Sequence, residues 1–286
     1  MPWLDDALEL LTNSPICGYQ AGGQGATEPT ALASLALIGH RAGTGAEIGL
    51  WLADLQSEDG SVGVRPREDT PRWPTSLALL AWLAIDAKQY SDNIARGVQW
   101  ASSLEGKRME RVGIGHNTEL AAWPWVEGTH SWVEPSALFT IAFKALDLAD
   151  HPRAVEAMLL LKDRILPTGG LNYGNTSVLG QLLRPHVQPS GITMVALAGQ
   201  LDEERKLAKT LDYLKISATS ETTSASLAWA LLGLAAHDRF LEDADKLLAA
   251  AYARTMLRDK SPYKVALLAL AALGPSSPLI TLQQTK

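Results

Sequence analysis

Apolar residues along the chain form two kinds of helical segment that alternate. Runs such as residues 77–85 and 225–236 are apolar on nearly every face, so helices formed there must be buried all round. The segments between such runs have amphipathic spacing with charged residues on one face, which predicts helices that lie outside the buried ones. These amphipathic segments cover residues 3–11, 47–56, 93–104, 152–165, 202–214 and 241–256.

A short pattern opens each buried run and occurs six times along the chain. It is a proline or a small polar residue that leads into an Ala/Leu-rich stretch. Five of the six copies contain proline, which suits the first position of a helix because its missing N–H has no partner there. The copies start at Glu28, Trp73, Glu134, Gln188, Thr223 and Ser261. The pattern therefore predicts six helical hairpins, with twelve helices in all.

Six buried and six amphipathic helices predict an all-α fold. The arrangement that encloses one set within the other is an α/α toroid, with inner and outer helix rings. An open superhelical stack is the alternative, but it exposes the apolar faces of its terminal repeats unless polar repeats cap them. No linker or shift in composition marks a boundary, so we expect one toroid domain over residues 1–273 and a loosely ordered tail over residues 274–286.

Composition narrows the class of protein. The chain has 286 residues, of which 47% are hydrophobic and 20% charged, and its net charge of −6 disfavours a nucleic-acid partner. The single cysteine, Cys17, excludes intramolecular disulfides and multi-cysteine zinc sites. The N-terminal residues lack a secretory pattern, and no apolar run approaches the ~20 residues of a transmembrane helix. We expect a cytoplasmic protein without a transmembrane segment and without a cofactor.

Residues 49–61 (GLWLADLQSEDGS) resemble a repeat shared by squalene and hopene cyclases and the β subunits of protein prenyltransferases. In that repeat, Gln and Gly follow a helix with aromatic and leucine residues. A weaker copy covers residues 96–106, and residues 169–174 resemble the turn of a third. Val62 departs from the family pattern, which usually closes with Trp. The resemblance implies an α/α toroid and a terpenoid or isoprenoid ligand.

The chain lacks the residues that carry the best-known reactions of that superfamily. The nearest string to the Asp-x-Asp-Asp acid motif of the cyclases begins at Asp243 and ends in Lys246. Cys17 lies outside the repeat in which the prenyltransferases place their cysteine zinc ligand. Any enzyme activity would therefore be cyclase- or isomerase-like, or prenyl-transferring, without the usual acid or zinc set, and we predict no metal site.

If the inner helices are parallel, their N-termini and the loops before them form one rim. The two longest of these loops, residues 106–133 and 167–188, are rich in aromatic and polar residues. Indoles stabilise cations and helix N-termini attract negative charge, which suits an apolar ligand with a polar or anionic head. The predicted ligand-binding residues are Trp73, Trp123, Trp125, Trp132, Asn172, Tyr173 and Gln188. The alternative is that the tryptophans only plug the end of the barrel.

Glu28 and Glu134 each precede a helix-opening proline, in a place where Ser, Thr, Asp or Asn is the usual N-cap. A glutamate shielded by tryptophans has a raised pKa and is suited to general acid catalysis. We therefore predict Glu28 and Glu134 as candidate catalytic acids, together with His130. The structural alternative is that each glutamate accepts hydrogen bonds from loop N–H groups and ties the rim together.

Two hypotheses follow for function. The first is a protein that binds an isoprenoid-like ligand in a central apolar cavity, with or without acid-initiated chemistry. It predicts a cavity that opens at the tryptophan-rich end. The second is a non-catalytic toroid whose rim binds a protein or peptide. It predicts a centre filled by side chains.

Overall fold

The computed structural model describes residues 2–43, 45–68, 70–110, 115–202 and 204–284. These residues form thirteen α-helices, one short 3-10 helix and one pair of two-residue strands. The predicted all-α fold class is therefore confirmed. Residues 111–114 of the first long loop and residues 285–286 of the predicted tail lie outside the described residues.

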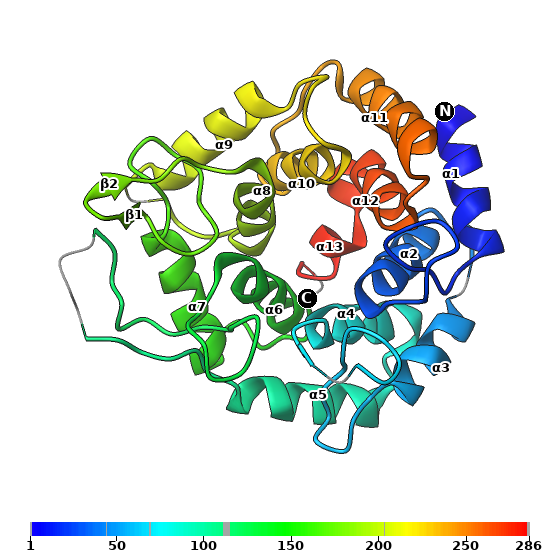
Figure 1. The fold of residues 1–286 in the computed structure, drawn as a ribbon, viewed down its shortest axis with the longest axis horizontal. Coiled ribbons are helices and arrows are strands. Elements are labelled where there is room, and N and C mark those ends of the chain that lie inside the picture. The colour runs from blue at the N-terminus through cyan, green and yellow to red at the C-terminus, as the bar shows by residue number, and fades with distance from the viewer. Residues whose placement is uncertain (1, 44, 69, 111–114, 203, 285–286) are drawn as a thin grey trace.

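Six even-numbered helices surround the centre of the molecule in Figure 1. Each packs against the next along the chain, and the last packs against the first, so their contacts form a cycle. They are buried along nearly their whole length, as the apolar runs predict. Their bounds are α2 (Thr27–Gly39), α4 (Thr75–Asp86), α6 (Val133–Ala145), α8 (Val187–Ala196), α10 (Ser224–Ala235) and α12 (Pro262–Ala272).

The odd-numbered helices α1 to α11 lie outside this set in Figure 1 and each contacts a neighbouring even-numbered helix. They are amphipathic, so one face packs inward while the charged face meets solvent. Their bounds are α1 (Pro2–Asn13), α3 (Ala46–Asp54), α5 (Ser91–Ser103), α7 (Pro152–Asp163), α9 (Lys206–Ser217) and α11 (Ala244–Arg258).

The even-numbered helices α6 and α8 run parallel. At their N-terminal ends, Gln188 Nε2 donates to Glu134 Oε1 at 3.1 Å. At their C-terminal ends, Lys144 Nζ donates to Ala196 O at 3.0 Å and to Ala198 O at 2.8 Å. The loops that enter these two helices therefore gather at one end of the molecule.

Hydroxyl groups fix these entering loops to the helices. The residue after the opening proline carries a hydroxyl in four helices, and that hydroxyl bonds both the N–H and the C=O of one loop residue upstream. Thr30 Oγ1 accepts from Cys17 N at 3.1 Å and donates to Cys17 O at 3.0 Å. Ser136 Oγ makes the same pair of bonds with Trp123. The four pairs are Thr30 with Cys17, Thr75 with Val62, Ser136 with Trp123, and Ser190 with Leu171. These bonds explain why small polar residues recur in the pattern.

The cyclase-like repeat forms a second connection between hairpins. Gln56 Nε2 donates to Gly60 O at 2.8 Å and to Asn93 O at 2.9 Å, and Asn93 Nδ2 donates back to Gln56 Oε1 at 2.8 Å. Gly60 has φ +93°, and a Cβ there would lie 2.3 Å from Arg96 O. The glutamine and glycine of the repeat thus attach the turn after α3 to the first turns of α5.

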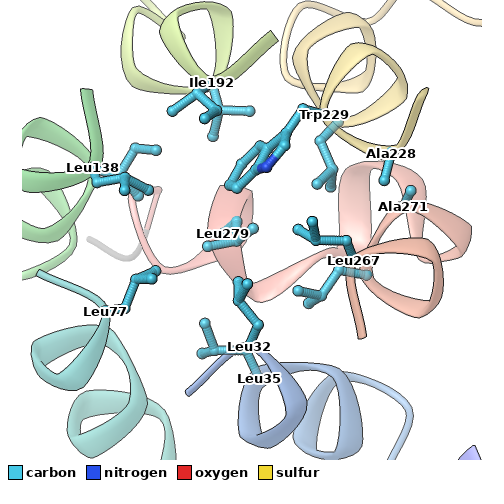
Figure 2. Close-up of a cluster of buried hydrophobic side chains, with 14 of the residues drawn as sticks. Leu32, Leu35, Leu77, Leu138, Ile192, Ala228, Trp229, Leu267, Ala271 and Leu279 are labelled. Atoms are coloured by element: carbon cyan, nitrogen blue, oxygen red, sulfur yellow. The ribbon is translucent and has the colours of Figure 1, made fainter. Parts of the chain in front are cut away.

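Two predictions about chain segments need correction. Glu28 and Glu134 are not N-caps, because α2 begins at Thr27 and α6 at Val133, so each glutamate is the second helical residue. The predicted loose tail is instead folded over residues 274–284, as η1 (Gly274–Ser276) and α13 (Pro278–Thr281). Apolar side chains of that segment enter the centre between the even-numbered helices (Figure 2).

A small hairpin projects from the second long loop. Its strands β1 (Ser177–Val178) and β2 (Gln181–Leu182) are antiparallel. Leu179 and Gly180 form the turn, with φ +50° and +76°. The hairpin lies at the outer edge of the molecule in Figure 1, beyond α7 and α9.

Candidate functional site

Two glutamates lie in the first turns of two different even-numbered helices. Glu28 is the second residue of α2 and Glu134 the second residue of α6. Gln188 holds the same position in α8 and donates to Glu134. The Tyr19 hydroxyl donates to Glu28 Oε2 at 2.7 Å. The repeat pattern itself therefore places these three polar side chains at one level of the structure.

Both carboxyls have strongly altered acidity. Burial raises the pKa of Glu28 to about 7, the hydrogen bond from Tyr19 acts in the opposite direction, and the charge of Glu134 raises it further. Burial raises the pKa of Glu134 to about 7 as well, while the bond from Gln188 lowers it. No ion pair among the described residues joins either carboxyl to a cationic side chain. At neutral pH each carboxyl is therefore able to give or take a proton.

Phenolic side chains surround the two carboxyls. Tyr263 follows the opening proline of α12, and its ring centroid lies 5.5 Å from that of Tyr19. Burial and the charges of Glu28 and Glu134 hold the pKa of Tyr263 well above its ordinary value. Burial and the charge of Glu134 also raise the pKa of Tyr173. These phenols stay protonated and offer hydrogen-bond donors next to the carboxyls.

A cavity of about 450 Å³ lies beside Glu134. Gln188 lines this cavity and also binds Glu134, so it connects the two. Most of the other lining residues are aromatic or carry hydroxyls, Glu221 adds a carboxylate, and the lining includes no lysine or arginine. The lining residues are Tyr173, Pro185, His186, Val187, Gln188, Tyr213, Thr219, Glu221, Thr222, Thr223 and Ser226.

The four predicted tryptophans do not gather at one place. Trp73 and Trp125 pack edge to face, 4.8 Å apart, beside a cavity of only about 30 Å³. Trp123 is fully buried, packs on Phe139 and donates from Nε1 to Ala101 O at 2.8 Å. Its indole is thus enclosed in the core and does not form a wall of the cavity beside Glu134. Trp132 is half-buried and forms the N-cap of α6, two residues before Glu134.

Asn172 and His130 lie in the two long loops, and neither lines the larger cavity. Asn172 Nδ2 donates to Arg184 O at 2.8 Å, and its Oδ1 accepts from the N–H of Tyr173 at 2.8 Å. Asn172 therefore shapes the loop that carries Tyr173. His130 is exposed and lines a different cavity of about 190 Å³, together with His116. Of the predicted residues, Tyr173 and Gln188 line the larger cavity, and Glu134 is connected to it through its hydrogen bond with Gln188.

Three tyrosines at the site are not among the residues predicted from the sequence. Tyr19 lies in a loop without periodicity, and nothing in its neighbourhood marks it as the partner of Glu28. Tyr263 was detectable, because it occupies the position at which the other copies of the pattern carry small residues. Tyr213 lies on α9, and its hydroxyl donates to Pro185 O at 3.1 Å.

Neither a metal centre nor a membrane span is found in the part of the chain that the structure describes. Its His, Cys, Asp and Glu residues form no group of three or more suited to hold a metal ion. None of its helices combines the length and the apolar character that crossing a membrane requires. In comparisons with known proteins, no family model matches the chain and no curated protein matches it.

Proposed function

We propose that the chain is an α/α toroid that binds a small polar molecule at the N-terminal ends of α6 and α8, with Glu134 as its proton donor or acceptor. The cyclic contacts of the even-numbered helices support the toroid. The connections made by Gln56 and Gly60 support a relation to the repeat of the cyclases and prenyltransferases. The single observation that carries the function is a cavity of about 450 Å³ whose lining residue Gln188 binds the carboxyl of Glu134, a group with a pKa of about 7.

The lining of the cavity favours a neutral or cationic ligand that donates hydrogen bonds. Glu221 is part of the lining, Glu134 lies behind Gln188, and the lining has no lysine or arginine to offset their charges. Hydroxyls of Thr223 and Ser226 add acceptors and donors. A volume of about 450 Å³ falls in the range of about 300–1,000 Å³ that small-molecule sites occupy.

The centre of the molecule is a less favourable place for the isoprenoid-like ligand of the first hypothesis. Leucines from α2, α4, α6 and α12 meet there with Trp229 and Leu279 (Figure 2). We therefore propose that the ligand lies at the end of the helices and is polar.

The experiment is a titration of the chain with spermidine and with methyl glucoside, followed by NMR of labelled tyrosine and histidine side chains. We expect one of the probes to shift Tyr173 and His186, and Glu134→Gln to weaken binding at least tenfold at pH 8. Glu127→Gln is the matched control, because Glu127 is an exposed glutamate of the other long loop. If neither probe shifts these side chains, or if both variants bind like wild type, the proposal is wrong.

Exposed apolar side chains favour a second candidate function, the binding of a protein or peptide at the two long loops. Met109 and Val126 in the first loop and Val178, Leu179 and Leu182 in the second are all exposed. Apolar side chains that gather on loops at one end are typical of an interaction surface.

A further inference from the structure

The C-terminal segment fills a space that the even-numbered helices enclose. Leu279 and Ile280 are completely buried, and Leu279 lies between Leu32, Leu77 and Trp229 in the centre of Figure 2. Each of the six helices sends at least one apolar side chain toward this point. The surroundings of Leu279 are therefore those of an apolar ligand in a binding site, although the occupant belongs to the same chain.

Two buried polar side-chain atoms of the segment lack hydrogen-bond partners in this position. Ser277 Oγ and Gln283 Oε1 are buried, and neither finds a hydrogen-bond partner within the described residues. Gln283 Nε2 donates to Leu279 O within the segment at 2.6 Å, whereas its bond to the surrounding helices, to Val195 O, is long at 3.4 Å. Buried polar atoms without partners favour states in which they become solvated. The segment is thus held mainly by its apolar side chains, which an apolar molecule is able to replace.

The route into the centre depends on a glycine. Gly39 is the last residue of α2, and a Cβ there would lie 2.5 Å from Leu273 Cδ1 and 2.9 Å from Pro278 Cδ. Pro278 is a rigid ring at the start of α13, so any larger residue at position 39 pushes against the segment. The missing side chain of Gly39 is what lets the segment enter.

An apolar cavity lies beside the place where the segment turns inward. Its volume is about 260 Å³, and its walls are mainly apolar, with Leu234, Phe240 and Leu273 as well as Gly274 and Pro275 of η1, although Arg239 and Asp245 also line it. Phe240 is largely exposed at this cavity. Gly274 has φ +54°, a conformation that glycine adopts without strain. The segment therefore turns at a permissive residue, next to a cavity whose walls are mainly apolar.

We propose that residues 274–284 are a displaceable plug, and that a molecule with an aliphatic chain binds at the cavity beside η1 and replaces α13 in the centre. This inference is independent of the proposed function, because it concerns the opposite ends of the helices and shares no residue with the cavity beside Glu134. The plug keeps the apolar centre covered until such a molecule is present.

The test uses the full chain and hydrogen exchange measured by mass spectrometry, with 1-decanol as the probe. We expect the amides of residues 280–284 to exchange at least tenfold faster than those in the middle of α2, and decanol to accelerate only the former. Gly39→Ala should accelerate the segment further and bind decanol at least tenfold more tightly in calorimetry, because the plug no longer competes. Gly43→Ala is the matched control, since a Cβ there meets nothing closer than 3.9 Å.

Two results would overturn the plug. One is exchange of residues 280–284 at the rate of α2, unchanged by decanol. The other is faster exchange in Gly39→Ala without tighter decanol binding. Leu279→Ala provides a second variant that weakens the plug without adding volume, and it should change exchange and decanol affinity in the same direction as Gly39→Ala. If neither variant yields a folded chain, the segment is a permanent part of the core and the proposal fails.

Discussion

The Tyr19 hydroxyl donates a hydrogen bond of 2.7 Å to Glu28 Oε2, and this bond partly offsets the effect of burial, which leaves the pKa of Glu28 raised at about 7. The tyrosine thus decides how much of Glu28 is ionised at neutral pH. Its own pKa is raised, chiefly by burial and then by the charge of Glu28, so it remains a donor over the whole range in which the glutamate titrates.

Replacing that tyrosine tests the relationship. In Tyr19→Phe the pKa of Glu28 should rise above its present value, because a bond to the ionised form is lost. We also expect a loss of stability of about 1–2 kcal/mol at pH 8, where Glu28 is charged, and a smaller loss at pH 5. Carbon NMR of labelled glutamate measures the titration, and Tyr173→Phe, an exposed tyrosine without a bond to Glu28, is the control. An unchanged or lower Glu28 midpoint contradicts the assignment.

The raised pKa of Glu134 makes stability depend on pH. Its ordinary value is 4.5 and its folded value is about 7, so between these two the folded state holds the proton more tightly than the unfolded state. Stability from this group is therefore complete below pH 4.5 and declines as the pH rises through 7. The shift corresponds to a decline of about 3 kcal/mol. Glu28 contributes in the same direction.

The variant Glu134→Gln should lose most of the pH-dependent decline in stability that Glu134 causes. We expect it to match wild type near pH 4.5 and to exceed it by up to about 3 kcal/mol at pH 8.5, because an amide carries no charge to bury. Urea unfolding at the two pH values measures the difference, and Glu127→Gln should follow the wild-type profile. Wild-type stability that rises between pH 5 and pH 8.5 would show that these carboxyls are not the dominant titrating groups.

Much of the helical pattern could be predicted from sequence, because burial and amphipathic spacing act locally. Residues 152–165, for example, were expected as an outer helix and form α7 (Pro152–Asp163). Helix starts were harder, since proline fits several positions of the first turn and not only the first. That ambiguity moved Glu28 and Glu134 from the expected N-cap into the helix.

Tertiary relationships were predictable only where a residue type was unusual for its place. Glu134 was detectable as a long carboxylate before a proline. The sequence could not distinguish tryptophans that line a cavity from those in the core, because a position in a loop does not determine which way an indole points. Trp123, for example, points into the core. The prediction of a loose C-terminal tail was wrong because Pro and Ser favour loops. Leu279 and Ile280 form an apolar pair in this segment, but they are buried against helices that are distant in the sequence.

The contact between α8 and α10 depends on two glycines. A Cβ at Gly191 would lie 2.4 Å from Trp229 O, and one at Gly233 would lie 2.8 Å from Gly191 O. Backbone atoms do not move aside as a flexible side chain does, so Gly191→Ala should separate the helices. We expect a loss of about 2–3 kcal/mol, larger than the gain of about 1 kcal/mol from helix propensity. Denaturant unfolding measures it, and Gly43→Ala should change stability by less than about 0.5 kcal/mol.

Leu179, at the tip of the hairpin, is an apolar residue that is exposed and has a left-handed backbone conformation. Leu179 is 99% exposed and has φ +50°, a left-handed conformation that leucine adopts only at a cost and that asparagine adopts readily. Leu179→Asn should therefore stabilise the isolated chain, by up to about 1 kcal/mol in thermal unfolding.

The same variant separates the two candidate functions. If the loops bind a protein or peptide, Leu179→Asn should weaken that binding, because an exposed apolar side chain at a hairpin tip is lost from the interface. Ligand binding at the cavity beside Glu134 should remain unchanged, since Leu179 does not line it. A peptide library displayed on phage and selected against wild type measures the first effect, and the spermidine and methyl glucoside titrations measure the second. Selected peptides that bind both proteins equally would remove Leu179 from the surface, and loss of the small ligand in the variant would contradict the separation of the two sites.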